Sequence, residues 1–306
     1  MSLCKVNYLR ILLTSRCNMF CAFCHREGAV CDSCDIDRTL LLEVISTMYN
    51  LGFKKFKLMG GEPMLYPNMA LIVREIRKRI GDSDLSMISN GTAASGEYEK
   101  LLSAGMNRLN ISVHGWMPEF FVANTRCSLK TYGRIKNTIL ELAEKRLIGK
   151  LNYVVKKGRN EEDFFKLLVF AGENELVVDA LNLLNMDGDT RLINLYYSMS
   201  SIERLIRSKY KIRDVTMVNN KYSLPSKLLK LENGAMVNLK ISRLNEENVF
   251  KACLDCGLKK SCIEGIKAIR LTPSGVLQPC LMRRDNGLAL IKKHDKSSIT
   301  KYLEYL

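Results

Sequence analysis

The sequence has no run of eighteen or more apolar residues and no low-complexity tract. Its first residues also lack the pattern of a signal peptide, in which a charged stretch precedes an apolar stretch and a small-residue cleavage site. We therefore expect no membrane-spanning helix and a soluble protein located in the cytoplasm. The 306 residues, 47% of which are hydrophobic, suffice for one large domain or two domains of ordinary size.

The eleven cysteines are an odd number, which argues against a complete framework of disulfides. Most of them form two clusters, one between residues 17 and 24 and the other between residues 253 and 280. In a reducing compartment, clustered thiols indicate a metal or iron–sulfur site.

The formal net charge of +15 predicts attraction to an anionic partner. The basic residues are dispersed along the chain and do not gather in one tail, so nucleic acid is not specifically indicated. A phosphorylated small molecule satisfies the charge equally well, and we expect a small anionic substrate and no binding to membranes or nucleic acid.

Short apolar stretches alternate with segments of helical periodicity through the first 184 residues. The predicted strands cover residues 6–13, 54–59, 84–88, 108–113, 150–155 and 177–184, and the predicted helices cover residues 38–50, 67–80, 95–104, 131–147 and 160–171. Six successive β/α units predict an α/β fold with a parallel sheet, open or curled into part of a barrel. Functional groups are then expected at the C-terminal ends of the strands.

The alternation changes after about residue 218. Two strand-like segments, residues 236–244 and 266–272, flank the second cysteine cluster with no clear helix between them. We therefore predict two parts: a partial (β/α)6 TIM-type barrel over residues 1–217 and a smaller C-terminal iron–sulfur extension over residues 218–306.

The first cluster, Cys17, Cys21 and Cys24, has the spacing C-x3-C-x2-C and directly follows the first predicted strand. Three thiolates can hold three irons of a cubane cluster and leave the fourth iron open to a substrate. A structural zinc site is the alternative, and it needs a fourth ligand nearby. That ligand is available from His25, Cys31 or Cys34.

This motif, with Phe23 before its last cysteine, resembles the signature of the radical S-adenosylmethionine (SAM) superfamily. A second match follows one β/α unit later, where "KLMGGEP" ends the second predicted strand and resembles the family's SAM-binding element. In that element glycines let the backbone approach a ligand closely, and the family uses it to meet the amino group of the methionine. The matching residues here are Gly60, Gly61, Glu62 and Pro63.

Two further strand ends resemble segments that contact SAM in the family. They are "ISNG", with Ser89 and Asn90, and "NISVHG", with Ser112 and His114, although local turn hydrogen bonding explains the second pair equally well. The resemblance implies that SAM is cleaved reductively at a [4Fe–4S] cluster to methionine and a 5′-deoxyadenosyl radical. This radical would abstract a hydrogen atom from the substrate.

Segments along nearly the whole chain, from "CHREG" to "RLTPSGVLQPCLMRRDN", resemble the GTP 3′,8-cyclase family of molybdenum cofactor biosynthesis. The resemblance implies a nucleotide substrate whose triphosphate is bound by basic residues on the barrel strands, matched here by Arg10, Lys55, Lys57, Lys150 and Arg270. It also implies an electron donor such as flavodoxin or ferredoxin. An auxiliary [4Fe–4S] cluster would be held by Cys253, Cys256, Cys262 and Cys280.

Several positions depart from that family. The family has three auxiliary cysteines and this chain has four, which can ligate a cluster completely or hold zinc. Their spacing resembles the twitch and SPASM extensions of radical SAM enzymes that modify peptides. Ala268 and Asn182 stand where the family has arginines. Alternatives therefore stay open: a diverged paralogue acting on another nucleotide or a peptide, an iron–sulfur protein for electron transfer or redox sensing, or a basic RNA-associated protein.

Overall fold

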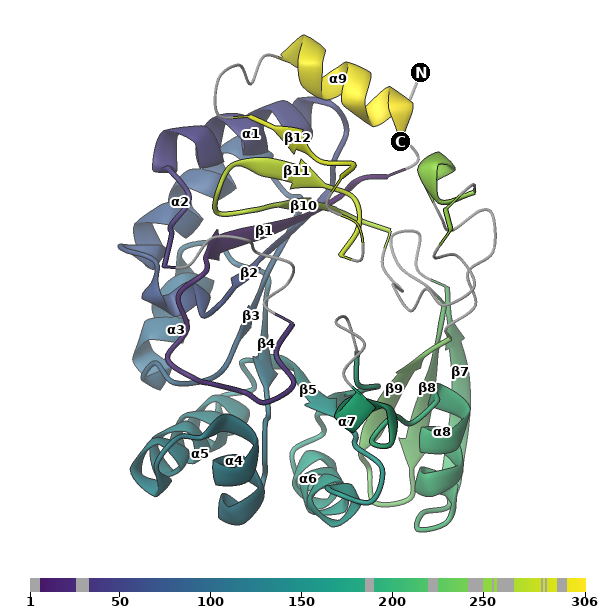
Figure 1. The fold of residues 1–306 in the computed structure, drawn as a ribbon. Helices are drawn as coiled ribbons and strands as arrows, with labels where there is room; N and C mark the ends of the chain where they lie inside the picture. Colours follow the sequence, from purple (N-terminus) through teal and green to yellow (C-terminus); the bar gives the residue numbers. More distant parts are fainter. Residues whose placement is uncertain are drawn as a thin grey trace.

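The computed structural model describes residues 6–25, 33–184, 190–219, 225–241, 250–254, 256–257, 267–281, 283, 285–290 and 296–306. In this part of the chain the strands form one twelve-stranded sheet with the order β12-β11-β10-β1-β2-β3-β4-β5-β6-β9-β8-β7. Figure 1 shows the strands curving around an open interior, with α1 to α6 on the outside of the curve.

The first part of the chain alternates strands with helices, as the sequence predicts. The elements are β1 (Tyr8–Thr14), α1 (Arg38–Asn50), β2 (Lys55–Gly60), the 3-10 helix η2 (Pro63–Leu65), α2 (Met69–Ile80), β3 (Asp84–Ser89), α3 (Ser95–Ser103), β4 (Arg108–Ser112), α4 (Pro118–Thr125), α5 (Leu129–Glu144), β5 (Ile148–Val154), α6 (Glu161–Glu173) and β6 (Val177–Leu181). Every predicted strand and helix of this part is confirmed, whereas the short helix α4 was not expected.

The later part adds elements at both ends of the sheet. They are α7 (Thr190–Ile193), α8 (Met199–Arg207), β7 (Ile212–Val218), β8 (Ser226–Leu231), β9 (Met236–Lys240), the 3-10 helix η4 (Lys251–Cys253), β10 (Ile269–Leu271), β11 (Val276–Gln278), β12 (Leu288–Ala289) and α9 (Lys296–Tyr305). The strand-like segments at 236–244 and 266–272 are confirmed as β9 and β10, while β7, β8 and the helices α8 and α9 were not predicted.

The parallel part of the sheet extends beyond the six expected strands. β9 runs parallel to β6 at one side, and β10 runs parallel to β1 at the other, so both segments flanking the second cysteine cluster continue the curve of the barrel. The fold is therefore an α/β partial TIM-type barrel. The predicted boundary at residue 217 falls inside β7, and the division into two parts stays a prediction.

The sequence explains why these strands lie at the centre. All seven residues of β1 are buried, as expected of a parallel strand that is covered on both faces. Helix α1 begins where the Asp37 carboxylate accepts a hydrogen bond from the Leu40 backbone N–H at 2.9 Å, which is a typical N-cap. No helix among the described residues is long and apolar enough to cross a membrane.

Candidate active site

A cavity of about 610 Å³ lies inside the curve of the sheet. Its lining gathers side chains from β1 to β6, β9 and β10, which are far apart in the sequence. Most of the residues singled out in the sequence contribute to it: Arg10, Cys17, Cys21, Phe23, Cys24, Lys55, Lys57, Gly60, Gly61, Glu62, Ser89, Asn90, Ser112, Lys150 and Arg270. Pro63 is buried and begins the 3-10 helix η2, directly after the lining residue Glu62.

The loop that follows β1 carries the three cysteines of the first cluster. Cys17 and Cys24 are exposed, Cys21 is half-buried, and all three line the cavity. Burial raises the pKa of Cys21 to about 12, so this thiol keeps its proton until a cation displaces it.

The described residues contain no group of three or more His, Cys, Asp or Glu side chains that could hold a single metal ion. A cubane cluster does not need such a group, because each of its thiolates binds a different iron. Three cysteines around one cavity therefore match the ligand set of an iron–sulfur cluster that keeps one iron open. Of the suggested fourth zinc ligands, Cys31 lies outside the described residues.

The "GGEP" element is bonded directly to this cysteine loop. The backbone N–H of Gly61 donates to the Thr14 carbonyl at 2.8 Å, and that of Glu62 donates to the Arg16 carbonyl at 2.8 Å. A Cβ atom on Gly61 would stand 2.2 Å from the Arg16 carbonyl oxygen, so only glycine permits this approach. The glycines thus join the end of β2 to the chain that leads into the first cysteine.

Glu62 is the buried carboxylate of the site. Its side chain is 1% exposed, and it accepts hydrogen bonds from Ser89 Oγ at 2.7 Å and from the backbone N–H groups of Asn90 at 2.7 Å and Met64 at 3.0 Å. Burial outweighs these bonds and raises the pKa of Glu62 to about 7. A cationic group of a ligand is the natural partner of such a carboxylate.

This raised pKa predicts how the stability of the unliganded protein depends on pH. The folded protein holds the Glu62 proton more tightly than the unfolded chain, so the free energy of unfolding should fall as the pH rises from about 4.5 to about 7. A shift of this size corresponds to about 3 kcal/mol. Chemical denaturation at several pH values measures it, and Glu62→Gln should flatten the decline. An equally steep decline in the variant would show that other groups cause it.

Asn90 links the end of β3 to the cysteine loop. Its Nδ2 donates to Asn18 Oδ1 at 2.8 Å and lies 4.0 Å from Cys17 Sγ. Across the cavity, Phe23 stands 5.7 Å from the ring of His114, measured between ring centres. Burial lowers the pKa of His114 to about 4, so this imidazole is neutral at physiological pH.

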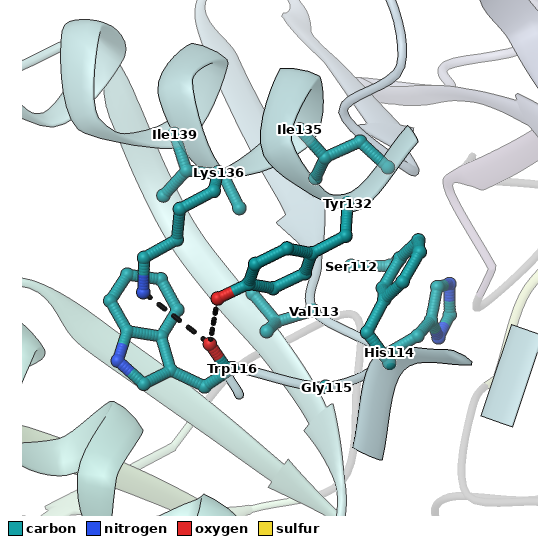
Figure 2. A pocket seen from close by; sticks show the side chains of 10 residues that line it. Ser112, Val113, His114, Gly115, Trp116, Tyr132, Ile135, Lys136 and Ile139 are labelled. Carbon is teal, nitrogen blue, oxygen red and sulfur yellow. Dashed lines mark hydrogen bonds between the residues drawn. The ribbon is translucent and has the colours of Figure 1, made fainter. Parts of the chain in front are cut away.

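The segment after β4 is held from behind by α5. Figure 2 shows Tyr132 and Lys136 pointing from α5 to the Trp116 carbonyl oxygen, to which they donate at 2.9 Å and 3.4 Å. The cavity enclosed between them measures about 10 Å³, which is room for about one water molecule. Ser112 and His114 are thus fixed on the wall of the large cavity by packing behind them.

The basic residues of β1, β2 and β10 lie side by side on the interior of the barrel. Arg10 is in register with Lys57 on one side and with Arg270 on the other. Arg10 is 5% exposed and Arg270 is fully buried. Burial, followed by the charge of Arg10, lowers the pKa of Lys57 to about 8. Lys55 also has its pKa lowered by burial, and its ammonium lies 4.5 Å from the centre of the Tyr8 ring.

Lys150 has a partner that the sequence did not indicate. Its ammonium donates to Asp179 Oδ1 at 2.9 Å, and Asn238 Nδ2 donates to the same oxygen at 2.7 Å. Lys240, at the end of β9, also lines the cavity, where it is half-buried and loss of hydration lowers its pKa. Asn238 and Lys240 were missed because only the pairing of β9 with β6 brings them to the site, and Asp179 was missed although it lies on the predicted strand β6.

The described auxiliary cysteines, Cys253, Cys256 and Cys280, are half-buried and not among the residues that line the cavity. The backbone N–H of Cys256 donates to the Cys253 carbonyl at 3.3 Å. The Arg283 guanidinium lies beside Asp285 and Cys256, and both contacts raise its pKa. Cys262, the fourth expected ligand, lies outside the described residues.

Comparison with known proteins gives the same picture as the motifs. Residues 11–171 match the model of the radical SAM superfamily. A probable GTP 3′,8-cyclase of Pyrococcus horikoshii is 28% identical over 291 residues, which cover 94% of this chain and 87% of that protein. A probable GTP 3′,8-cyclase of Saccharolobus solfataricus is 31% identical over 294 residues, which cover 92% of this chain and 85% of that protein.

Solved structures agree on the fold at low sequence identity. Streptococcus suis SuiB bound to S-adenosylmethionine has a TM-score of 0.68 and 13% identity, over 98% of this chain and 67% of SuiB. The structure of anSMEcpe with bound AdoMet has a TM-score of 0.53 and 12% identity, over 97% of this chain and 96% of that protein.

Proposed function

The chain belongs to the radical SAM superfamily, and from this premise we propose that it abstracts hydrogen from a nucleoside triphosphate, most concretely as a GTP 3′,8-cyclase. It is an enzyme whose cofactors are SAM and a [4Fe–4S] cluster, so the alternative of a non-catalytic electron carrier is not retained. When bound, the cluster supplies the electron that cleaves SAM to methionine and a 5′-deoxyadenosyl radical.

The residues of the cavity divide into two sets with different roles in this proposal. Cys17, Cys21 and Cys24 would hold the cluster. Glu62, kept in place by Ser89 and two backbone N–H groups, would bind the amino group of SAM through charge and hydrogen bonding. The curve of the sheet encloses both and limits the access of water to the reacting atoms.

The second set of residues would determine which substrate binds. Arg10, Lys57 and Arg270 are adjacent in cross-strand register and lie on the same cavity as the cysteines; the two arginines are buried and Lys57 is half-buried. Three cations in one row create a positive field that attracts an anion into the cavity. A polyphosphate supplies several negative charges in a compact space, and its oxygens accept the hydrogen bonds that arginine and lysine donate. This row of cations is the observation that supports a nucleotide.

A second candidate is a related enzyme for another nucleotide. Asn182 lines the cavity where the family has an arginine, and its Nδ2 donates to Tyr196 Oη at 3.3 Å. Ala268, at the other such position, is fully buried and brings no charge. Two fewer cations would alter how a base or phosphate is bound while leaving SAM cleavage unaffected.

The chemistry also needs an electron donor, for which a flavodoxin or ferredoxin is the proposed partner. Thiols that ligate iron must stay reduced, so the proposed location is the cytoplasm. The auxiliary cluster would be held by Cys253, Cys256, Cys280 and Cys262.

Anaerobic reconstitution followed by single-turnover assays tests the proposed function. Reduced, iron-loaded protein should form 5′-deoxyadenosine from SAM, and GTP should accelerate this formation and yield a cyclised product. Acceleration by a different nucleotide in a matched panel would favour the second candidate. Absence of cleavage in a fully loaded and reduced protein would contradict the radical SAM activity itself.

A further inference from the structure

A buried lysine lies next to the cysteine loop and belongs to neither of the two sets described above. Lys156 follows β5 and is only 8% exposed. Its ammonium lies 5.0 Å from the centre of the Phe23 ring, and Phe23 immediately precedes Cys24. A cation over an aromatic face at this distance is attracted to it, so Lys156 holds Phe23 against the wall of the barrel.

Asn124 connects this lysine to the loop by direct hydrogen bonds. The Lys156 ammonium donates to Asn124 Oδ1, while the backbone carbonyl of Asn124 accepts from the Ala22 N–H at 3.0 Å. Asn124 Nδ2 donates in turn to the His114 carbonyl at 2.6 Å. Lys156 is thus tied to the loop twice, through the Phe23 ring and through Asn124.

The charge of Lys156 has no salt bridge in the described part of the chain, since its hydrogen-bond acceptor is a neutral amide. Burial lowers the pKa of Lys156, whereas the nearby side chains of Cys21 and Asp163 raise it electrostatically to a smaller extent. Buried ammonium groups in proteins are normally paired with an anion. Three thiolates and the cluster they hold would provide that negative charge on the side of the lysine where the loop lies.

We propose that Lys156 is a positioning residue that provides the positive counter-charge of the cluster bound by Cys17, Cys21 and Cys24 and raises its reduction potential. The inference rests on the proposed cluster ligands. Reduction adds one electron from an external donor to the cluster. A nearby fixed cation stabilises the added negative charge, most strongly where water is excluded. Residues beyond the direct ligands tune metal centres in this way.

Lys156→Met tests this role because it keeps the length of the side chain and removes the charge. Reconstituted protein should bind as much iron per chain as the wild type, but a potentiometric titration followed by electron paramagnetic resonance should give a more negative midpoint potential. Lys156→Arg should stay close to the wild-type potential. Lys157→Met is the matched control, because that neighbouring lysine is exposed and should leave the potential unchanged.

Asn124→Asp provides a second route if Lys156→Met fails to load iron. It places a carboxylate beside the Lys156 ammonium at nearly constant side-chain volume. Because this carboxylate neutralises the lysine, the substitution should also make the midpoint potential more negative. Wild-type potentials in the loaded variants would overturn the inference. A wild-type protein that binds no cluster through Cys17, Cys21 and Cys24 would instead overturn the proposed function, and iron counting in the wild type separates the two failures.

Discussion

Replacing Cys21 by serine is expected to abolish formation of 5′-deoxyadenosine while the protein stays folded. The side chain changes by one atom, and the backbone bonds that hold the loop, from Phe20 N–H to Thr125 and from Ala22 N–H to Asn124, do not involve the thiol. A serine hydroxyl is a far poorer ligand for iron than a thiolate. The loss should therefore affect the cluster and not the fold.

The measurement pairs iron content and the spectrum of the reduced cluster with a single-turnover assay of SAM cleavage. Circular dichroism checks that secondary structure is unchanged. Cys127→Ser is the matched control, since Cys127 Sγ lies 3.7 Å from the Asn18 carbonyl at the edge of the same loop and is not a proposed ligand. Full cleavage by the Cys21 variant, or equal loss in the control, would contradict the assignment of the three ligands.

The fold and much of this site could be predicted from the sequence because both depend on local patterns. Short apolar strands alternate with amphipathic helices, and this alternation alone predicts a parallel sheet with its functional groups at one edge. Cys17, Glu62 and Asn90 follow β1, β2 and β3, so their meeting in one cavity is a direct consequence of the topology.

The residues that sequence reasoning missed depend on long-range pairing. Lys240 and Asn238 lie on β9, which returns to pair with β6 only after the excursion through α8, β7 and β8. Apolar runs of five residues do not specify their partners. Strand β7 was missed for a different reason: six of its seven residues are exposed, so it shows no alternation of buried and exposed positions.

Lys156 shows that the sequence does not predict whether a single residue is buried. In the sequence it stands beside Lys157 in "VVKKGRN", and a pair of lysines after a strand is typical of a solvated turn. The structure buries the first and exposes the second. That difference arises from the position of α4, whose last turn places Asn124 between Lys156 and the cysteine loop.

Replacing Lys57 by methionine is expected to weaken binding of the nucleotide while leaving basal SAM cleavage unchanged. Lys57 stands between Arg10 on β1 and Ser86 on β3, and partial burial weakens the hydration that would compensate its charge. A hydrogen bond to a charged group contributes about 1.5–3 kcal/mol, which corresponds to roughly a 10- to 100-fold loss of affinity. The fold is not at risk, because Lys57 is only half-buried and methionine replaces most of the length of its apolar stem.

The dependence of affinity on pH gives this prediction a second, independent readout. Because the pKa of Lys57 is lowered to about 8, the ammonium is charged below that pH and attracts the anion, and it loses its proton above it. The affinity of the wild type for GTP, measured by calorimetry on reconstituted protein, should therefore fall as the pH rises through about 8. The Lys57→Met variant should bind weakly with a flatter profile over this range.

Lys54→Met provides the control for the loss of one positive charge from the same segment. Lys54 is exposed and its ammonium lies 4.6 Å from the centre of the Tyr49 ring, outside the residues that line the cavity. If both variants weakened binding equally, the effect would come from the net charge of the protein. If only Lys57→Met weakened it and the pH profile flattened, the interaction would be local, because distant surface charges are screened by salt whereas buried ones are screened much less.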